Sequence, residues 1–179
     1  MRHPLAFVLS SLCLALSSPA RAQDITFAFT DLTTCGRDAP VDKEAEEHGG
    51  DVPIVCAGPG GGYSVTEFYS AYDIHRSVST KEHPDFDIPL RPTKEKCLAA
   101  TYGKNLEWRM KDGKPFAVIQ RLTCYGLNKT ETGPGKRLAE YLVVKGLKGH
   151  ESIDGAVNTK TKDANEKARA LADAGLQGR

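Results

Sequence analysis

Residues 104–125, KNLEWRMKDGKPFAVIQRLTCY, decide the fold because they are typical of a single β-hairpin. Asp112-Gly113 favours a two-residue type I′ turn, in which both central residues need a positive φ. Such a turn places Lys111 opposite Lys114 and Met110 opposite Pro115. Continued without interruption, this register gives the pairs Trp108–Ala117 and Leu106–Ile119 on one face, and Arg109–Phe116 and Glu107–Val118 on the other.

The face that carries Trp108, the sole tryptophan, is almost wholly apolar and must be covered by another part of the chain. Residues 161–174 are predicted to form the covering helix. Asp163 with Glu166 resembles a capping box, and Gly175 is a natural stop. The apolar stripe of this helix is shallow enough for close packing on a sheet, and its members are Ala164, Ala168, Leu171 and Ala172.

Most other segments are rich in β-branched and aromatic residues and are predicted to be strands. Their ranges are 25–33, 52–56, 63–69, 73–79, 97–102, 138–144 and 152–157. Residues 80–96 carry three prolines and indicate an irregular connection. We therefore expect an α+β domain in which about seven antiparallel strands form an open or sandwich-like sheet, with the C-terminal helix packed on it.

Residues 1–22 are typical of a secretory signal peptide. A basic start is followed by the apolar run LAFVLSSLCLAL at residues 5–16 and by Ala20-Arg21-Ala22, a small-x-small cleavage pattern. The run is shorter than the roughly 20 residues of a membrane-spanning helix, and a retained anchor is the alternative. Cleavage would leave residues 23–179 as a single disulfide-braced domain in the periplasm or outside the cell.

Charge gives no support for a nucleic-acid partner or for an anionic membrane surface. Residues 1–22 hold two arginines and no acid, so the 24 basic and 23 acidic residues of the chain become 22 and 23 after cleavage. This near balance lacks the basic excess of nucleic-acid-binding proteins. No second long apolar run exists, so no membrane span is expected after cleavage.

Four cysteines remain once the signal is removed: Cys35, Cys56, Cys97 and Cys124. An even number in an exported chain indicates disulfides, although four cysteines allow three connectivities. Cys35–Cys56 and Cys97–Cys124 are favoured, because each bridge closes a loop between neighbouring predicted strands. The rival interpretation, a zinc site, lacks the closely spaced cysteine pairs that such sites use.

The predicted binding surface is the glycine-rich turn at residues 58–62 together with two tyrosines. Its members are Gly60, Gly61, Gly62, Tyr63 and Tyr69. The turn lacks the Gly-Lys-Ser/Thr ending of a phosphate-binding loop, and a flexible hairpin turn is the alternative. The acidic residues 36–51 lack EF-hand spacing and are interpreted as a solvated loop.

No motif indicates catalytic residues, a cofactor or a metal site. Asp73, His75 and Arg76 form the one cluster that could be tested as a hydrolase site. On a strand, Asp73 and His75 point to one face and Arg76 to the other, so a surface salt bridge is the competing interpretation.

Two motifs resemble those of an uncharacterised family of small secreted proteins of rhizobia and related alphaproteobacteria. Glu107-Trp108-Arg109, Gly113-Lys114-Pro115-Phe116-Ala117 and Arg121 resemble its E-W-R…G-K-P-x-A…R stretch. Residues 163–173 resemble its D-A-N-x-x-A-R…A-D helix, and Cys35 with Cys56 resembles its N-terminal cysteine pair. The chain departs from the family in lacking a cysteine near residue 150 and at the C-terminus, and in carrying Cys97 and Cys124.

The resemblance implies a bacterial envelope setting and no particular activity. The sequence favours a non-catalytic binding or inhibitory module whose partner is an unknown envelope protein or ligand. The alternative function is a hydrolase acting on an envelope component.

Overall fold

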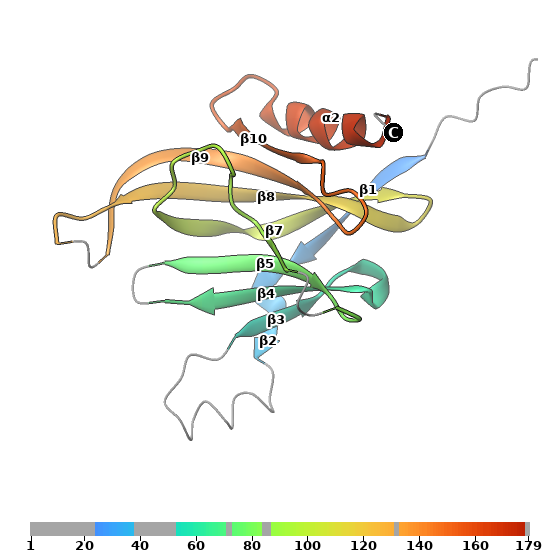
Figure 1. The fold of residues 1–179 in the computed structure, drawn as a ribbon, viewed down its shortest axis with the longest axis horizontal. Helices are drawn as coiled ribbons and strands as arrows, with labels where there is room; N and C mark the ends of the chain where they lie inside the picture. The colour runs from blue at the N-terminus through green and yellow to red at the C-terminus, as the bar shows by residue number, and fades with distance from the viewer. Residues whose placement is uncertain (1–23, 38–52, 71–72, 84–86, 131–132, 178–179) are drawn as a thin grey trace, which may run out of the picture.

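The computed structural model describes residues 24–37, 53–70, 73–83, 87–130 and 133–177. These residues form two five-stranded antiparallel sheets and a C-terminal helix, which confirms the expected α+β class with ten strands in place of about seven. Figure 1 shows three layers, with the helix above one sheet and the second sheet below it. The predicted signal peptide and most of the acidic segment 36–51 lie outside the described residues.

The sheet next to the helix, sheet A, has the strand order β1-β7-β8-β9-β10, and the other, sheet B, has the order β2-β3-β4-β5-β6. Short 3₁₀ turns, η1 and η2, precede β2 and β4. The bounds are β1 Ile25–Asp31, η1 Leu32–Thr34, β2 Gly36–Arg37, β3 Ile54–Ala57, η2 Pro59–Gly61, β4 Tyr63–Tyr69, β5 Ile74–Thr80, β6 Asp87–Pro89, β7 Ala99–Lys111, β8 Lys114–Leu127, β9 Pro134–Gly146, β10 Asp154–Asn158 and α2 Ala164–Gln177.

The hairpin turn between β7 and β8 is confirmed, but its register is wrong beyond the second pair. Asp112 and Gly113 have φ values of 50° and 76°, and the pairs next to the turn are as expected. A β-bulge then leaves Phe116 unpaired and moves the pairs from Arg109 to Leu106 by one residue. A second irregularity between Leu106 and Tyr102 shifts the remaining pairs in the opposite direction. The observed pairs are Arg109–Ala117, Trp108–Val118, Glu107–Ile119 and Leu106–Gln120.

Trp108 is fully buried, as expected, but sheet B covers it and not the helix. Its indole Nε1 donates a hydrogen bond of 2.9 Å to Thr30 Oγ1 on β1. The ring of Tyr63, from sheet B, lies with its centroid 6.0 Å from that of the indole. The predicted cover was therefore wrong, because the uninterrupted register assigned the apolar side chains of β8 to the wrong faces.

The helix α2 packs on the opposite face of sheet A. Ala168 and Ala172 are completely buried there, as the alanine stripe predicted. Two ion pairs hold the helix to β7. Arg169 donates to both oxygens of Glu107 at 2.8 and 2.9 Å, and Arg109 donates to both oxygens of Asp173 at 3.0 and 2.7 Å.

The ends of α2 differ from the prediction. Asp163 has a φ of 57°, in the left-handed region, whereas a helix N-cap residue has extended backbone. Gly175 lies inside the helix and does not end it. A Cβ atom on Gly175 would lie 2.3 Å from Ile153 Cγ1, so this glycine permits close packing of the helix on the segment before β10.

Both favoured disulfides, Cys35–Cys56 and Cys97–Cys124, are present with Cα–Cα distances of 5.1 and 4.9 Å. Sulfurs that are joined in disulfides are not thiolate ligands, so Cys35, Cys56, Cys97 and Cys124 in this state do not offer the ligand set of a zinc site. Cys35–Cys56 braces the start of sheet B beside the cluster around Trp108, and Cys97–Cys124 braces the start of β7 against β8.

No helix among the described residues has the length and apolar character needed to cross a membrane.

Gly58 supports the main core by leaving room for the indole. A Cβ atom on Gly58 would lie 2.8 and 2.9 Å from two ring atoms of Trp108. We expect Gly58→Ala to lower the free energy of unfolding by about 1–3 kcal/mol through overpacking. Urea denaturation followed by Trp108 fluorescence measures this change.

Gly62→Ala is the matched control, because Gly62 has a φ of −84° and a Cβ atom added to it would meet no other atom within 4 Å. It should change the free energy of unfolding by less than about 0.5 kcal/mol. Equal effects of the two substitutions would contradict the close approach at Gly58.

Candidate functional site

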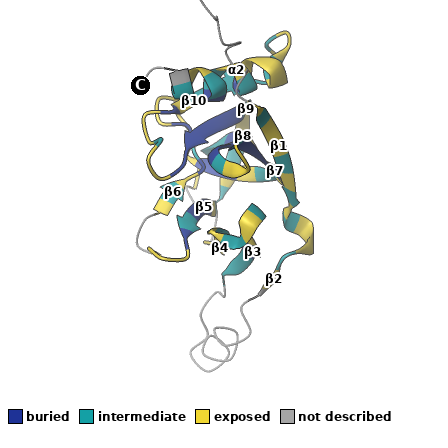
Figure 2. Ribbon diagram, turned by 90° about the vertical axis from the view of Figure 1, so that its right-hand side faces the viewer, coloured by how far each residue is buried: buried dark blue, intermediate teal, exposed yellow. Residues whose placement is uncertain are grey.

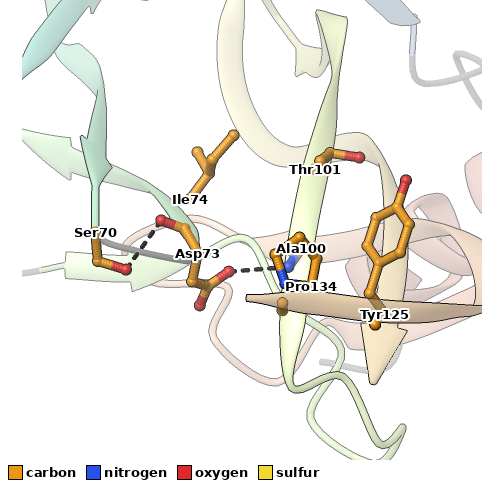
Figure 3. Close-up of a pocket in the computed structure, with 9 residues that line it drawn as sticks. Ser70, Asp73, Ile74, Ala100, Thr101, Tyr125 and Pro134 are labelled. Carbon is orange, nitrogen blue, oxygen red and sulfur yellow. Dashed lines mark hydrogen bonds between the residues drawn. The ribbon is translucent and has the colours of Figure 1, made fainter. Parts of the chain in front are cut away.

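A pocket of about 520 Å³ opens between the two sheets at the start of β7. β1 pairs with β7 only from Asn105 to Lys111, so the first residues of β7 pair with β8 alone and leave one strand edge open. Figure 3 shows this edge with side chains from both sheets around it. The pocket is lined by Ser70, Asp73, Ile74, Ala99, Ala100, Thr101, Tyr125, Pro134 and Gly135.

Asp73 joins the two sheets at the pocket. Its buried carboxylate accepts a hydrogen bond of 2.9 Å from the backbone N–H of Ala100, on the open edge of β7 (Figure 3). The same carboxylate accepts from Arg91 at 2.5 Å to each oxygen. An open strand edge presents unpaired backbone groups, and Asp73 satisfies one of them from the neighbouring sheet.

Arg91 and Tyr102 lie behind Asp73. Burial alone would lower the pKa of Arg91, but its hydrogen bond to Asp73 and the nearby acidic groups raise it overall, so the guanidinium stays charged. Burial raises the pKa of the Tyr102 phenol, against the opposing pull of Arg91. The Tyr102 hydroxyl is buried beside Arg91 without hydrogen-bond geometry to it.

A second buried polar network lies deeper between the sheets. Arg76, on β5, forms an ion pair with Glu67 on β4 and donates at 3.0 Å to Gln120 Oε1 on β8. It also donates at 2.8 Å to the carbonyl of Gly103, which accepts from Gln120 Nε2 as well. The guanidinium lies 4.7 Å from the centroid of the Tyr102 ring. Arg76 thus ties sheet B to the strands that form the pocket.

The predicted Asp73, His75 and Arg76 cluster divides as the strand alternation indicates. His75 Nε2 lies 3.3 Å from Asp73 Oδ2, and most of the His75 side chain is exposed. Arg76 points the other way, into the space between the sheets. The stronger partner of Asp73 is Arg91, which the sequence did not indicate, and whether His75 takes part in any reaction stays a prediction.

The predicted binding surface does not form one site. Gly60 and Gly61 both have a φ of 70° in the turn before β4, and Tyr63 is half-buried against Trp108. Tyr69 is exposed at the far end of β4, about 20 Å away for a strand of this length. Of these five residues none lines the pocket at Asp73, and their role in binding stays a prediction.

Sequence reasoning missed Arg91, Gln120 and Tyr125. A signal for Gln120 was present, because a glutamine between Val118 and Leu122 interrupts an otherwise apolar face of β8. Arg91 lay in a segment interpreted as irregular. Tyr125 had no distinguishing pattern, because only the packing of the two sheets places it in the same pocket as Asp73.

The pocket combines features of small-molecule sites. Its walls are mostly aliphatic, the Tyr125 ring offers an aromatic surface, and the hydroxyls of Ser70 and Thr101 add polar groups at the rim. The carboxylate of Asp73 already accepts hydrogen bonds from Arg91 and from the backbone of Ala100. It therefore helps to form the pocket wall and can act as a weak hydrogen-bond acceptor, but it does not offer a free negative charge. The arrangement is suited to holding a ligand.

Comparison with known proteins assigns no family to this chain. No protein-family model, curated protein or solved structure matches it. The function of the pocket therefore has to follow from its own residues, and the resemblance to the rhizobial family stays a prediction.

Arg76→Met tests whether the buried network holds the two sheets together. It would leave Glu67, which is largely buried, without its cation and remove the hydrogen bonds to Gly103 and Gln120, so we expect the free energy of unfolding to fall by about 3–5 kcal/mol. Urea denaturation followed by Trp108 fluorescence provides the measurement. Adding Glu67→Gln to this variant should recover part of the loss, because the unpaired charge is gone.

Arg121→Met is the control, since Arg121 is half-exposed and pairs with Glu140 at the surface of sheet A. It should lower the free energy of unfolding by less than about 1 kcal/mol. A similar loss in Arg76→Met and Arg121→Met would show that the network does not hold the sheets together.

Proposed function

We propose that this chain is an exported, non-catalytic binding module whose ligand occupies the pocket between Asp73 and Tyr125. The pocket volume of about 520 Å³ carries this proposal, because it falls within the range of small-molecule sites. The walls come from strands of both sheets, and the Cys97–Cys124 disulfide braces one side. A site supported in this way needs little ordering when a ligand binds.

The ligand class follows from the polarity of the walls. The charge of Asp73 is balanced by Arg91, so the pocket favours an uncharged group. The Tyr125 ring suits a ligand ring with a flat apolar face. The open edge of β7 and the hydroxyls of Ser70 and Thr101 suit amide and hydroxyl groups attached to the ligand ring. An N-acetylated sugar of the bacterial envelope has this chemistry.

Binding is favoured over catalysis by the state of the reactive groups. The four cysteines of the described residues are joined in disulfides, which removes them as nucleophiles. Asp73 accepts hydrogen bonds from Arg91 and Ala100, so its lone pairs are largely committed. The alternative of a hydrolase rests on the contact of His75 with Asp73 alone.

Titration with di-N-acetylchitobiose, followed by ¹H–¹⁵N NMR of the full chain expressed in an exporting bacterial host, tests the proposal. Backbone signals of residues 99–101 and of Tyr125 should shift with saturation, and cellobiose, which lacks the acetamide groups, should bind more weakly. Thr101→Trp should raise the Kd at least about tenfold by filling the pocket, equivalent to about 1.4 kcal/mol.

Leu138→Trp is the control for Thr101→Trp, because Leu138 is an exposed strand residue outside the pocket. It should leave the Kd unchanged, and so should His75→Ala if no reaction is involved. Shifts that are absent from residues 99–101, or binding that survives Thr101→Trp, would argue against the proposal.

A further inference from the structure

Strand β1 leaves one edge of sheet A open. It pairs with β7 on one side and, within the described part of the chain, with no strand on the other. Two aromatic side chains lie on the helix side of this strand, Phe27 and Phe29, which are 52% and 55% exposed and pack edge to face with centroids 5.5 Å apart. The opposite edge of the sheet, β10, is instead packed against α2, where Leu171 fills the space above Gly155.

The β1 edge lacks the features that usually protect an edge strand. Its seven residues, ITFAFTD, contain no proline and no lysine, and the one charge is at the last position. Natural proteins commonly place such residues on free edges to prevent pairing with another chain. In this chain the open edge carries aromatic side chains in their place, which favours pairing.

The sequence of β1 is its own complement in an antiparallel pair. Residues 26–30 read Thr-Phe-Ala-Phe-Thr, a palindrome centred on Ala28. A twofold axis at Ala28 would place Phe27 against the partner's Phe29 and Thr26 against the partner's Thr30. Aromatic–aromatic and Thr–Thr pairs are among the favourable cross-strand combinations.

We propose that two copies of this chain associate through antiparallel pairing of their β1 strands about a twofold axis at Ala28, which joins the two A sheets into one continuous sheet. Such an interface is isologous, because each copy offers the same surface to the other. The two exposed pairs of phenylalanines would form a four-ring cluster across the axis.

Charge is complementary in this register. Asp31 lies opposite the partner's Ile25, and in the partner's own sheet that residue pairs with Lys111. Residues that lie directly opposite one another on neighbouring strands point to the same face of the sheet. Asp31 and the partner's Lys111 are two strands apart, so their Cα atoms would lie about 10 Å from each other. A lysine side chain spans much of that distance, and the symmetric arrangement makes this approach twice.

The arrangement of Phe27 is supported from the helix side. The guanidinium of Arg169 lies 5.0 Å from the centroid of its ring while its donors bind Glu107. This contact holds the ring of Phe27 at the edge of the sheet.

The β1 surface borders residues 105–111 of β7, whereas the pocket borders residues 99–101. Association through β1 therefore leaves the pocket open, and the dimer proposal does not rest on the proposed function of the pocket.

Sedimentation equilibrium of the full chain expressed in an exporting bacterial host tests this proposal. We expect a concentration-dependent monomer–dimer equilibrium. Phe27→Lys/Phe29→Lys should raise the dissociation constant at least about tenfold, because the pairs that face each other lose their rings and become like-charged. Phe27→Lys/Phe29→Glu loses the same rings but places opposite charges together, so it should dimerise more tightly than the double-lysine variant.

Phe68→Lys is the matched control, because Phe68 is 46% exposed on β4, an interior strand of sheet B. It should leave the equilibrium unchanged. The emission of buried Trp108 reports whether each variant keeps its fold. A wild-type chain that stays monomeric at all concentrations would overturn the proposal. So would a dimer whose dissociation constant is unchanged in Phe27→Lys/Phe29→Lys, and so would equal dissociation constants for the two double variants.

Discussion

The structure depends on the alternation of side chains at Glu107-Trp108-Arg109 in the centre of β7. The indole points into the space between the sheets, where Thr30, Tyr63 and Gly58 enclose it. Its two neighbours point the opposite way and bind the helix through Arg169 and Asp173. Because consecutive strand residues face opposite sides, three adjacent positions hold together all three layers seen in Figure 1.

The two faces of sheet A are stabilised by different means. The helix side combines small alanines with ion pairs whose strand partners are buried and whose helix partners are partly exposed, and these pairs orient α2 on the sheet. The sheet B side has an apolar cluster at Trp108 and a polar network around Arg76 further along. Figure 2 shows buried residues concentrated along β8 and β9, between the helix and sheet B. The ion pair of Arg76 with Glu67 lies between the sheets, where a charged group needs nearly complete hydrogen bonding. Gly103 and Gln120 help to supply these hydrogen bonds.

The edges of sheet A account for both surfaces to which we assign a role. β7 is longer than β1, so its first residues extend past the pairing, and Asp73 reaches across from sheet B to satisfy one exposed N–H. The pocket is a consequence of this mismatch in strand length. At the other end of β7 the edge is occupied by β1, whose own outer side carries Phe27 and Phe29.

The sequence by itself determined the turn at Asp112-Gly113, the type of most strands and of the helix, and the alanine stripe, because these depend on local backbone preference and periodicity. It favoured the observed cysteine pairing among three possible connectivities, and it did not indicate the short strand β6. It could not reveal the bulge at Phe116, since a bulge changes register without a distinctive residue pattern, and this bulge decided which face of β8 meets the helix. Arg91, Tyr125 and Asp73 come from segments far apart in the chain. The meeting of Asp73 and Tyr125 at one pocket, the ion pair of Arg91 with Asp73, and the covering of Trp108 by a second sheet were decided only by the tertiary structure.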